Sequence, residues 1–420
     1  MINYILRHPY FEAVNCRIAG KNRKAATASS LMTAGVIGLL MTVALLPVAC
    51  TIPLKSAFNE QVTSEQFATV AIADLEEALT FARTGPIEDR RVIAVTGYAS
   101  GTINGVDLSK VLDRHIDDPI TVYLELGYEP LRHLIDHAPP EAGVSIPYGS
   151  LVSPVDLSEH HIAAATNFPL HAGETSVEGG PFLFPKIVEP TGPYDNVSAG
   201  DGLLDYEVEL AWVTLRPLPA GHRPKEMGLI LCNDYSDRAT LLRHVDTDDV
   251  ESGRGFTTGK SFPGYLPVGN LFVIPKDFRA FTSRVKLELY VNDSLRQRSM
   301  ANEMIWDVDR TLDEIWKRRH MNWDHKGEQI SLLGDGDRIE ARVLIMSGTP
   351  HGVVFQGIPI QDRLEGALDW MLGGWDRSLP ANVIEAYIHD AKSDQIYLQP
   401  GDRVVIHVDR LGVIDNRITH

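Results

Sequence analysis

The chain has 420 residues, of which 44% are apolar and 23% are charged, and its formal net charge is −17. The negative charge and the lack of a basic aromatic stripe argue against a nucleic-acid-binding protein. Three scattered cysteines, Cys16, Cys50 and Cys232, are too few for a disulfide or zinc framework. The length exceeds one typical hydrophobic core, so we expect two folded parts behind a non-globular leader.

The leader comes first in the chain. A basic stretch at 17–24 precedes residues 25–54, which carry no charged side chain. This order is typical of a secretory signal or of a single membrane-spanning helix. Residues 45–50 resemble the cleavage box of bacterial lipoproteins, although a proline three places before Cys50 departs from it. We expect an exported protein that is membrane-anchored or a periplasmic lipoprotein, and the alternative is an over-extended start upstream of a cytoplasmic enzyme.

The segment after the leader has mixed character and no catalytic cluster. The apolar spacing between Phe58 and Ala82 predicts one or two amphipathic helices. A short strand is predicted at 91–95, and helices are predicted at 108–112 and 131–137. We therefore divide the chain into a basic leader, a signal or anchor segment, a structural N-terminal domain and a catalytic domain, at residues 1–30, 31–50, 58–150 and 157–420.

Beyond Leu157 short β-rich runs dominate, and Gly, Pro and Asp separate them. Strands are predicted at 208–214, 229–232, 271–274, 285–291, 341–347 and 403–408. Asn292-Asp293 suits a tight hairpin turn, and 311–319 predicts a helix with Leu312 and Ile315 on one face. Many short strands with few helices indicate a strand-rich α+β or roll architecture. No dinucleotide fingerprint, Walker loop or serine-hydrolase elbow opens any of these elements.

Two glutamates, Glu207 and Glu209, are separated by one residue on a predicted strand. That spacing places both carboxylates on one side, roughly 7 Å apart, and Asp234 ends the next apolar run. Like charges this close are unfavourable unless a cation lies between them, so the pattern predicts a hard divalent ion. An all-carboxylate set suits Mg²⁺, or Mn²⁺ or Ca²⁺, better than zinc. The alternative is an exposed strand whose glutamates face water.

Eight segments follow one another in the order known from one enzyme family. They are 167–174, 184–186, 206–211, 233–238, 259–262, 291–297, 347–353 and 398–402. Together they resemble the C-terminal catalytic domain of the fumarylacetoacetate hydrolase family, over about 162–418. The resemblance implies a mixed β-sandwich roll with a smaller α/β N-terminal domain, a divalent ion on Glu207, Glu209 and Asp234, and a homodimer.

The resemblance also assigns the remaining site residues. His171 and Glu174 match the family's histidine and glutamate, and their spacing places them on one face of a helical turn. The glutamate would orient the imidazole, which takes a proton from water beneath a closing lid. Lys260 is the matching catalytic cation. The matching substrate-binding candidates are Lys186, Thr349 and Arg238, and Arg238 can also brace the metal carboxylates.

Departures from the family pattern also occur. Asp237, Ala239 and Leu241 replace the usual alanine, aspartate and glutamine, and Pro263-Gly264 replaces a usual Asp-Thr pair. Since these positions border the pocket, the substrate preference cannot be transferred.

The combined reading predicts a divalent-metal-dependent hydrolase that cleaves a C–C bond in a small 1,3-dioxo, acylpyruvate-like carboxylic acid. Alternatives are a decarboxylase, isomerase or hydratase of a related 2-oxo dienoate, or a tethered binding protein without turnover.

Overall fold

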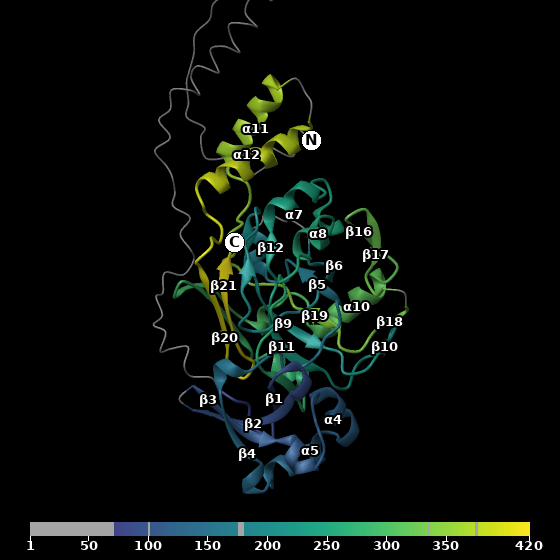
Figure 1. Cartoon of the computed structure of the whole chain (residues 1–420). Helices are drawn as coiled ribbons and strands as arrows, with labels where there is room; N and C mark the ends of the chain where they lie inside the picture. Colours follow the sequence, from purple (N-terminus) through teal and green to yellow (C-terminus); the bar gives the residue numbers. More distant parts are fainter. Residues whose placement is uncertain (1–70, 100, 175–179, 335, 374–376) are drawn as a thin grey trace, which may run out of the picture. The chain divides into compact units, whose positions relative to one another are not determined.

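The computed structural model describes residues 71–420 except 100, 175–179, 335 and 374–376 (Figure 1). The expected basic leader at 1–30 and the signal or anchor segment at 31–50 lie outside the described residues. Export and anchoring therefore stay predictions. Within the part of the chain that is described, no helix is both long and apolar enough to cross a membrane.

A large mixed sheet forms the centre of the described structure. Its ten strands, in spatial order, are β4 (Gly143–Pro147), β3 (Thr102–Asp107), β2 (Arg91–Ala99), β1 (Ala78–Thr84), β13 (Phe272–Pro275), β11 (Gly228–Asn233), β9 (Val208–Val213), β19 (Leu344–Met346), β5 (His160–Ala165) and β6 (Phe182–Ile187). Neighbours pair antiparallel except β19 and β5. Every residue of β9 and β11 is buried, as expected for strands covered on both faces.

A second sheet packs near the first. It contains β15 (Ser294–Met300), β14 (Lys286–Val291), β20 (Arg403–Val408), β21 (Gly412–Thr419) and β7 (Val197–Ser198). Apolar side chains of both sheets, such as Leu210 and Leu289, belong to one buried cluster. The strand-rich α+β prediction is therefore confirmed.

The predicted tight hairpin at Asn292-Asp293 is also confirmed. The two residues connect β14 to β15, and both have positive φ, 49° and 64°. Two consecutive residues with positive φ define the turn that matches the twist of a two-residue hairpin, and Asn and Asp tolerate this conformation. Asn292 additionally bonds Asp402 and the backbone N–H of Arg403.

The N-terminal part joins the same large sheet. Strand β1 pairs with β2 on one side and with β13 of the expected catalytic domain on the other. The helix predicted up to Ala82 is wrong at its end, because Ala78–Thr84 is a strand. Its residues are buried on both faces between two strands, and this tertiary pairing overrides the local helical spacing. The domain division at 58–150 and 157–420 stays a prediction, and strand pairing connects its two parts.

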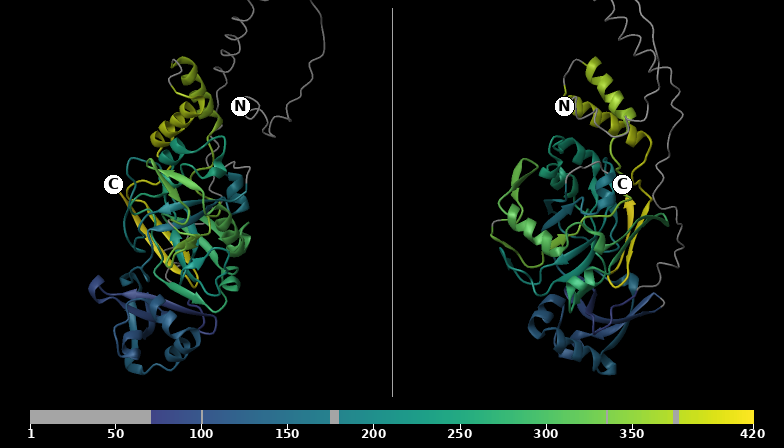
Figure 2. Two further views of the ribbon diagram at one scale, coloured as in Figure 1. Left: turned by 90° about the vertical axis from the view of Figure 1, so that its right-hand side faces the viewer. Right: turned by 180° about the vertical axis from the view of Figure 1, so that it is seen from behind.

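The described helices surround the sheets (Figure 1). Their bounds are α3 (Leu108–Leu112), α4 (Pro119–Leu126), α5 (Tyr128–Asp136), α6 (Pro169–Glu174), α7 (Arg238–His244), α8 (Phe256–Lys260), α9 (Phe278–Thr282), α10 (Val308–Arg318), α11 (Ile360–Leu372) and α12 (Leu379–Ser393). The helices predicted near 108–112, 131–137 and 311–319 are confirmed as α3, α5 and α10. The pair α11 and α12 was not predicted, and it projects from the strand-rich body in all three views (Figures 1 and 2).

Three short strand pairs complete the described part of the fold. They are β8 (Leu204–Asp205) with β12 (Ser236–Asp237), β10 (Leu218–Pro219) with β18 (Arg338–Ile339), and β16 (Asn322–His325) with β17 (Glu328–Ser331). Strand β8 ends two residues before Glu207, and β12 ends directly before Arg238, so this pair holds together the two segments that lead into the site described below.

Replacing Asn292 by alanine is expected to lower the free energy of unfolding by about 1–2 kcal/mol, because it forces alanine into positive φ and removes two side-chain hydrogen bonds. Asp293→Gly is the matched control, since glycine adopts positive φ without strain, and it should leave stability unchanged or raise it by up to about 1 kcal/mol. Urea unfolding of both variants measures this. Equal losses in the two variants would contradict the turn assignment.

Candidate metal centre and active site

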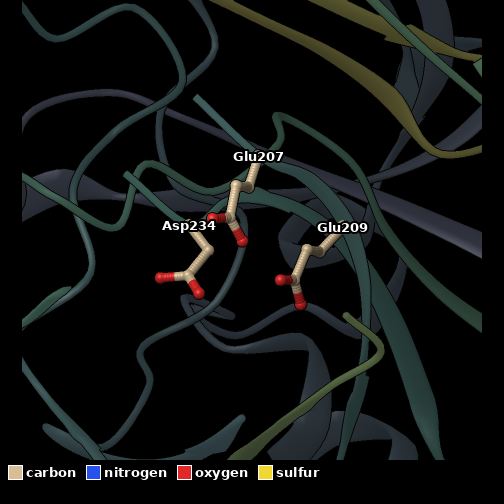
Figure 3. A group of neighbouring side chains, drawn as sticks. All are labelled: Glu207, Glu209 and Asp234. Carbon is tan, nitrogen blue, oxygen red and sulfur yellow. The ribbon is translucent and has the colours of Figure 1, made fainter. Parts of the chain in front are cut away.

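Three acidic side chains converge where β9 begins and β11 ends. Glu207 directly precedes β9, Glu209 is its second residue, and Asp234 directly follows β11. The two strands are antiparallel, with Cys232 opposite Glu209, and the Asp234 N–H donates to the Glu207 carbonyl at 2.9 Å. One oxygen of each carboxylate lies within 4.8 Å of the others, and the carboxylates point toward a common space (Figure 3).

All three carboxylates are buried, so the alternative of glutamates facing water is wrong. The predicted spacing explains the geometry, since residues one apart on a strand share a side. Val208 and Leu210 belong to the apolar core on the other side. Burial of three like charges in one place is costly unless cations balance them.

The donor set fits a hard divalent ion. One Glu209 oxygen accepts the Gly348 N–H at 2.9 Å, and the other is a buried oxygen without a hydrogen-bond partner among the described residues. Burial, reinforced by Asp234 and Glu207, raises the pKa of Glu209 well above its ordinary value. A buried oxygen left open next to two further carboxylates is what an oxygen-seeking dication requires. Glu207, Glu209 and Asp234 would therefore hold it.

Two lysines reach the triad from different elements. Lys260, at the end of α8, lies 2.9 Å from both the Glu207 and the Asp234 carboxylates. Lys186, on β6, lies 2.5 Å from the other Asp234 oxygen and donates to the Lys260 carbonyl at 2.5 Å. Both lysines are buried. The structure thus brings together the two lysines that the sequence motifs predicted.

Arg238 contacts the triad from the other side. Its guanidinium lies 2.5 Å from Glu207 and 2.8 Å from Asp205, and it is buried. Asp205, which the sequence analysis did not single out, also accepts the N–H groups of Val354 and Phe355 at 2.9 and 3.1 Å. Arg238 therefore pairs with the Glu207 carboxylate, whereas its bracing of a metal ligand and its contact with substrate stay predictions.

The charges in this cluster are nearly balanced. Four buried carboxylates, those of Asp205, Glu207, Glu209 and Asp234, face three buried cations, which are Lys186, Lys260 and Arg238. The formal sum is one net negative charge, and a bound dication would change it to one net positive charge. A site with that sign suits an anionic ligand such as a carboxylic acid.

The pKa directions follow from these contacts. Burial disfavours the Glu207 carboxylate, but Lys260 and Arg238 outweigh it and lower its pKa to about 2. Burial likewise disfavours the Lys260 ammonium, but Asp234 and Glu207 outweigh it and raise its pKa. For Lys186 burial dominates, and its pKa is lowered despite the Asp234 contact. The two lysines beside the same carboxylate thus have opposite shifts.

The predicted histidine–glutamate pair lies in α6. The nitrogen Nδ1 of His171 is 3.6 Å from a Glu174 carboxylate oxygen, and His171 is buried. Glu174 in turn accepts the Gly352 N–H with both oxygens, at 3.1 and 3.0 Å. His171 is near enough to Glu207 to contribute to lowering its pKa. The pair therefore borders the triad, as the motif predicted.

Thr349 is placed differently from the expectation of a substrate-facing hydroxyl. Its hydroxyl donates to the Val208 carbonyl at 3.0 Å and accepts from the Gln297 amide at 2.8 Å. Gln297 also accepts the Val208 N–H and donates to the Pro350 carbonyl. These bonds hold the backbone of Val208, the residue between Glu207 and Glu209. A substrate role for Thr349 stays a prediction.

The sequence patterns did not single out two further residues, Gln297 and Asn167, although both lie within the family-like motif segments. Gln297 ties β15 to β9, as just described. Asn167 donates to the Trp306 and Ser347 carbonyls at 3.0 and 2.8 Å and accepts the Trp306 N–H. It thereby fixes the start of the His171 helix to the loop that carries Thr349. The only signal in the sequence was the position of these two amides within the family-like motif segments. Their hydrogen-bond partners become visible only in the fold.

The departures from the family pattern have structural explanations. Asp237 is the N-cap of α7 and accepts the Leu203 and Ala239 N–H groups, both at 3.0 Å. Ala239 packs in a cluster with Ile384 and Tyr387 of α12. Pro263 and Gly264 line a cavity that no triad residue lines.

Comparison with known proteins decides the family. A model of the fumarylacetoacetate hydrolase C-terminal region matches residues 160–419, which is more than half of the chain. The chain belongs to the fumarylacetoacetate hydrolase family. The resemblance drawn from the motifs is thereby confirmed, and members of this family named among its relatives are enzymes.

Relatives differ in their named activities. The mitochondrial oxaloacetate tautomerase FAHD2B of Bos taurus is 24% identical over 337 residues, which covers 77% of this chain and 86% of the relative. The oxaloacetate tautomerase YisK of Bacillus subtilis is 29% identical over 211 residues, 47% of this chain and 60% of the relative. A fumarylacetoacetate hydrolase structure from Exiguobacterium antarcticum matches with a TM-score of 0.51 and 19% identity, covering 81% of this chain and 99% of that one, which shows a shared fold.

Glu209→Gln is expected to abolish measurable Mn²⁺ or Mg²⁺ binding, because it removes one of three anionic ligands and leaves an amide nitrogen in the site. Calorimetric titration of the purified chain measures this. Glu251→Gln, at an exposed glutamate, is the matched control and should bind as the unchanged protein does. Retained affinity in the Glu209 variant would exclude the triad as the metal site.

Arg238→Met is expected to weaken divalent-ion binding by about 10–100-fold without abolishing it, since the ligand Glu207 loses the group that orients it. Arg243→Met is the control on the same helix, because Arg243 pairs with Glu385 at the surface. The same titration compares the two. Equal divalent-ion affinities in the Arg238 and Arg243 variants would show that Glu207 does not depend on Arg238 for its orientation.

Proposed function

We propose that the chain catalyses metal-dependent keto–enol chemistry on a small 2-oxo carboxylic acid, with oxaloacetate as the first substrate to test. The observation that carries the proposal is the buried triad, Glu207, Glu209 and Asp234, adjoining the His171–Glu174 pair. A divalent ion, for which we propose Mg²⁺, would supply Lewis-acid polarisation of the 2-oxo group.

The charge of the cluster supports an anionic substrate. Lys260 and Lys186 keep two ammonium groups against Asp234, and such fixed cations stabilise negative charge that develops on the substrate oxygens. Mammalian relatives aligned over most of both chains are oxaloacetate tautomerases. Their substrate is a 2-oxo dicarboxylate, which agrees with the sign of the charge proposed for the loaded site.

His171 is the proposed proton carrier. A tautomerase must take a proton from the carbon beside the 2-oxo group and place one on the 2-oxo oxygen, or do the reverse, and an imidazole suits this task near neutral pH. Glu174 lies 3.6 Å from its Nδ1 atom, and a carboxylate on that side favours the protonated imidazole that such a carrier must form. The Gly352 N–H donates to both oxygens of the Glu174 carboxylate, so the backbone holds this negative charge beside the imidazole.

The second candidate is hydrolysis of a C–C bond in an acylpyruvate-like 1,3-dioxo acid. The histidine–glutamate pair favours it, since the same imidazole can take a proton from water that attacks the distal carbonyl. Bond cleavage then leaves the enolate of a 2-oxo acid, so both candidates need the same stabilised enolate. They differ in whether water enters the site.

A substrate panel separates the candidates. We expect the purified chain with Mg²⁺ to accelerate loss of the oxaloacetate enol absorbance, and chelation of the ion to remove this acceleration. Acylpyruvates should be cleaved slowly or not at all if the first candidate holds. Fast acylpyruvate cleavage without oxaloacetate turnover would assign the hydrolase, and tight binding of both acids without turnover would indicate a binding protein.

His171→Ala is expected to lower kcat by about 10²–10⁴-fold, the usual contribution of general acid–base catalysis, and to leave Mg²⁺ affinity within a few-fold. His222→Ala, at an exposed histidine, is the control and should retain full activity. Steady-state kinetics with the accepted substrate and calorimetry with Mg²⁺ measure the two quantities. Unchanged kcat in the His171 variant would remove it from the mechanism.

A further inference from the structure

Helix α11 exposes its apolar side chains and buries polar and small residues. Five large apolar residues on it are exposed, with exposed fractions of 75% for Ile360, 54% for Leu364, 44% for Leu368, 56% for Met371 and 84% for Leu372. The buried positions of the same helix are Asp362 and Gly366. An ordinary surface helix shows the opposite arrangement.

The five exposed residues form a stripe, which we call the α11 stripe. At about 100° per residue their side chains fall within an arc of about 120°, and the exposed Gln361 falls within the same arc of the helix. The other side of α11 packs against α12, where Gly366 comes so near that a Cβ there would lie 2.4 Å from the Val383 Cα. The stripe is thus turned away from the only helix that α11 packs on closely among the described residues.

We propose that the α11 stripe binds the same stripe of a second copy of this chain, with the two helices antiparallel about a two-fold axis. Contiguous apolar patches of more than a few hundred Å² are uncommon on monomers and mark interaction surfaces. This inference is independent of the proposed chemistry, because no residue of the stripe belongs to the triad or to its braces.

The spacing of the stripe suits a second copy. Its residues at 360, 364, 368 and 372 are equally spaced. The four positions are therefore symmetric about position 366, and an antiparallel copy presents apolar residues at the same heights. In an antiparallel pair centred on position 366, Ile360 meets Leu372 of the other copy and Leu364 meets Leu368. A two-fold interface requires this self-complementarity, since the same surface must serve as both partners.

The charge at the rim favours a protein partner over a lipid surface. Glu365 and Asp369 border one side of the stripe and Arg363 the other, so acidic residues outnumber basic ones at the rim, whereas helices that lie on membranes are rich in lysine and arginine there. The two-fold axis brings the acidic rims of both copies to the same side. Association is therefore expected to strengthen as salt is added, because salt screens this repulsion and leaves apolar contact unaffected.

Cysteine cross-linking of the full chain tests the register. The double variant Leu364→Cys/Leu368→Cys should form a disulfide between position 364 of one copy and position 368 of the other, identified by mass spectrometry of linked peptides. Arg363→Cys/Asp369→Cys is the matched control. Its positions are also symmetric about 366 but lie on opposite sides of the stripe, so it should cross-link at least tenfold less.

Three results would overturn the proposal. Equal cross-linking in the control would show random collision, and a disulfide from position 364 to Cys50 or Cys16 of the same chain would show that the leader covers the stripe. Flotation with phosphatidylcholine vesicles that depends on the stripe would assign it to lipid.

A second measurement does not depend on disulfide chemistry. Leu364→Glu/Leu368→Glu should weaken self-association at least tenfold in sedimentation equilibrium, with an unchanged circular dichroism spectrum, because these side chains are exposed in the single chain. If the folded variant associates as strongly as the unchanged protein, at low and at high salt, the α11 stripe is not the contact.

Discussion

The mutual repulsion of Glu207, Glu209 and Asp234 is the constraint on which the rest of the site depends. Three carboxylates buried within 4.8 Å of one another can persist only where cations surround them. Lys260, Lys186 and Arg238 come from three different elements, α8, β6 and α7. The strand order therefore has to bring β6, β9 and β11 into one sheet, and the second sheet supplies Gln297 to hold the edge of β9.

The residues beside Arg238 that depart from the family pattern have packing and capping contacts of their own. Asp237, Ala239 and Leu241 lie close to Arg238 in the sequence; Asp237 caps α7, Ala239 packs in an apolar cluster with α12, and Leu241 is buried. The chemistry depends on the charged groups and on the backbone that orients them. The side chain of Ala239 on α7 instead packs against α12, so its size is set by that contact.

Sequence patterns predicted the parts of the molecule that depend on local spacing. The alternation at 207 and 209, the turn at Asn292-Asp293 and the pair His171–Glu174 each need only neighbours along the chain, and all three are found as predicted. The strand at Ala78–Thr84 could not be found in this way, because its conformation is set by β2 and β13. Gln297 and Asn167 were missed for the same reason, since their partners lie 50 to 180 residues away.

Asp205 connects the candidate metal centre to the segment that leads into the helix pair α11–α12. Its carboxylate binds Arg238 and also the backbone of Val354 and Phe355, in the segment that continues into α11. A shortened chain that omits α11 and α12 but also disturbs this segment would loosen the guanidinium that aligns Glu207. Truncations meant to isolate a minimal catalytic body should therefore keep the residues up to Phe355 intact and rejoin the chain only beyond them.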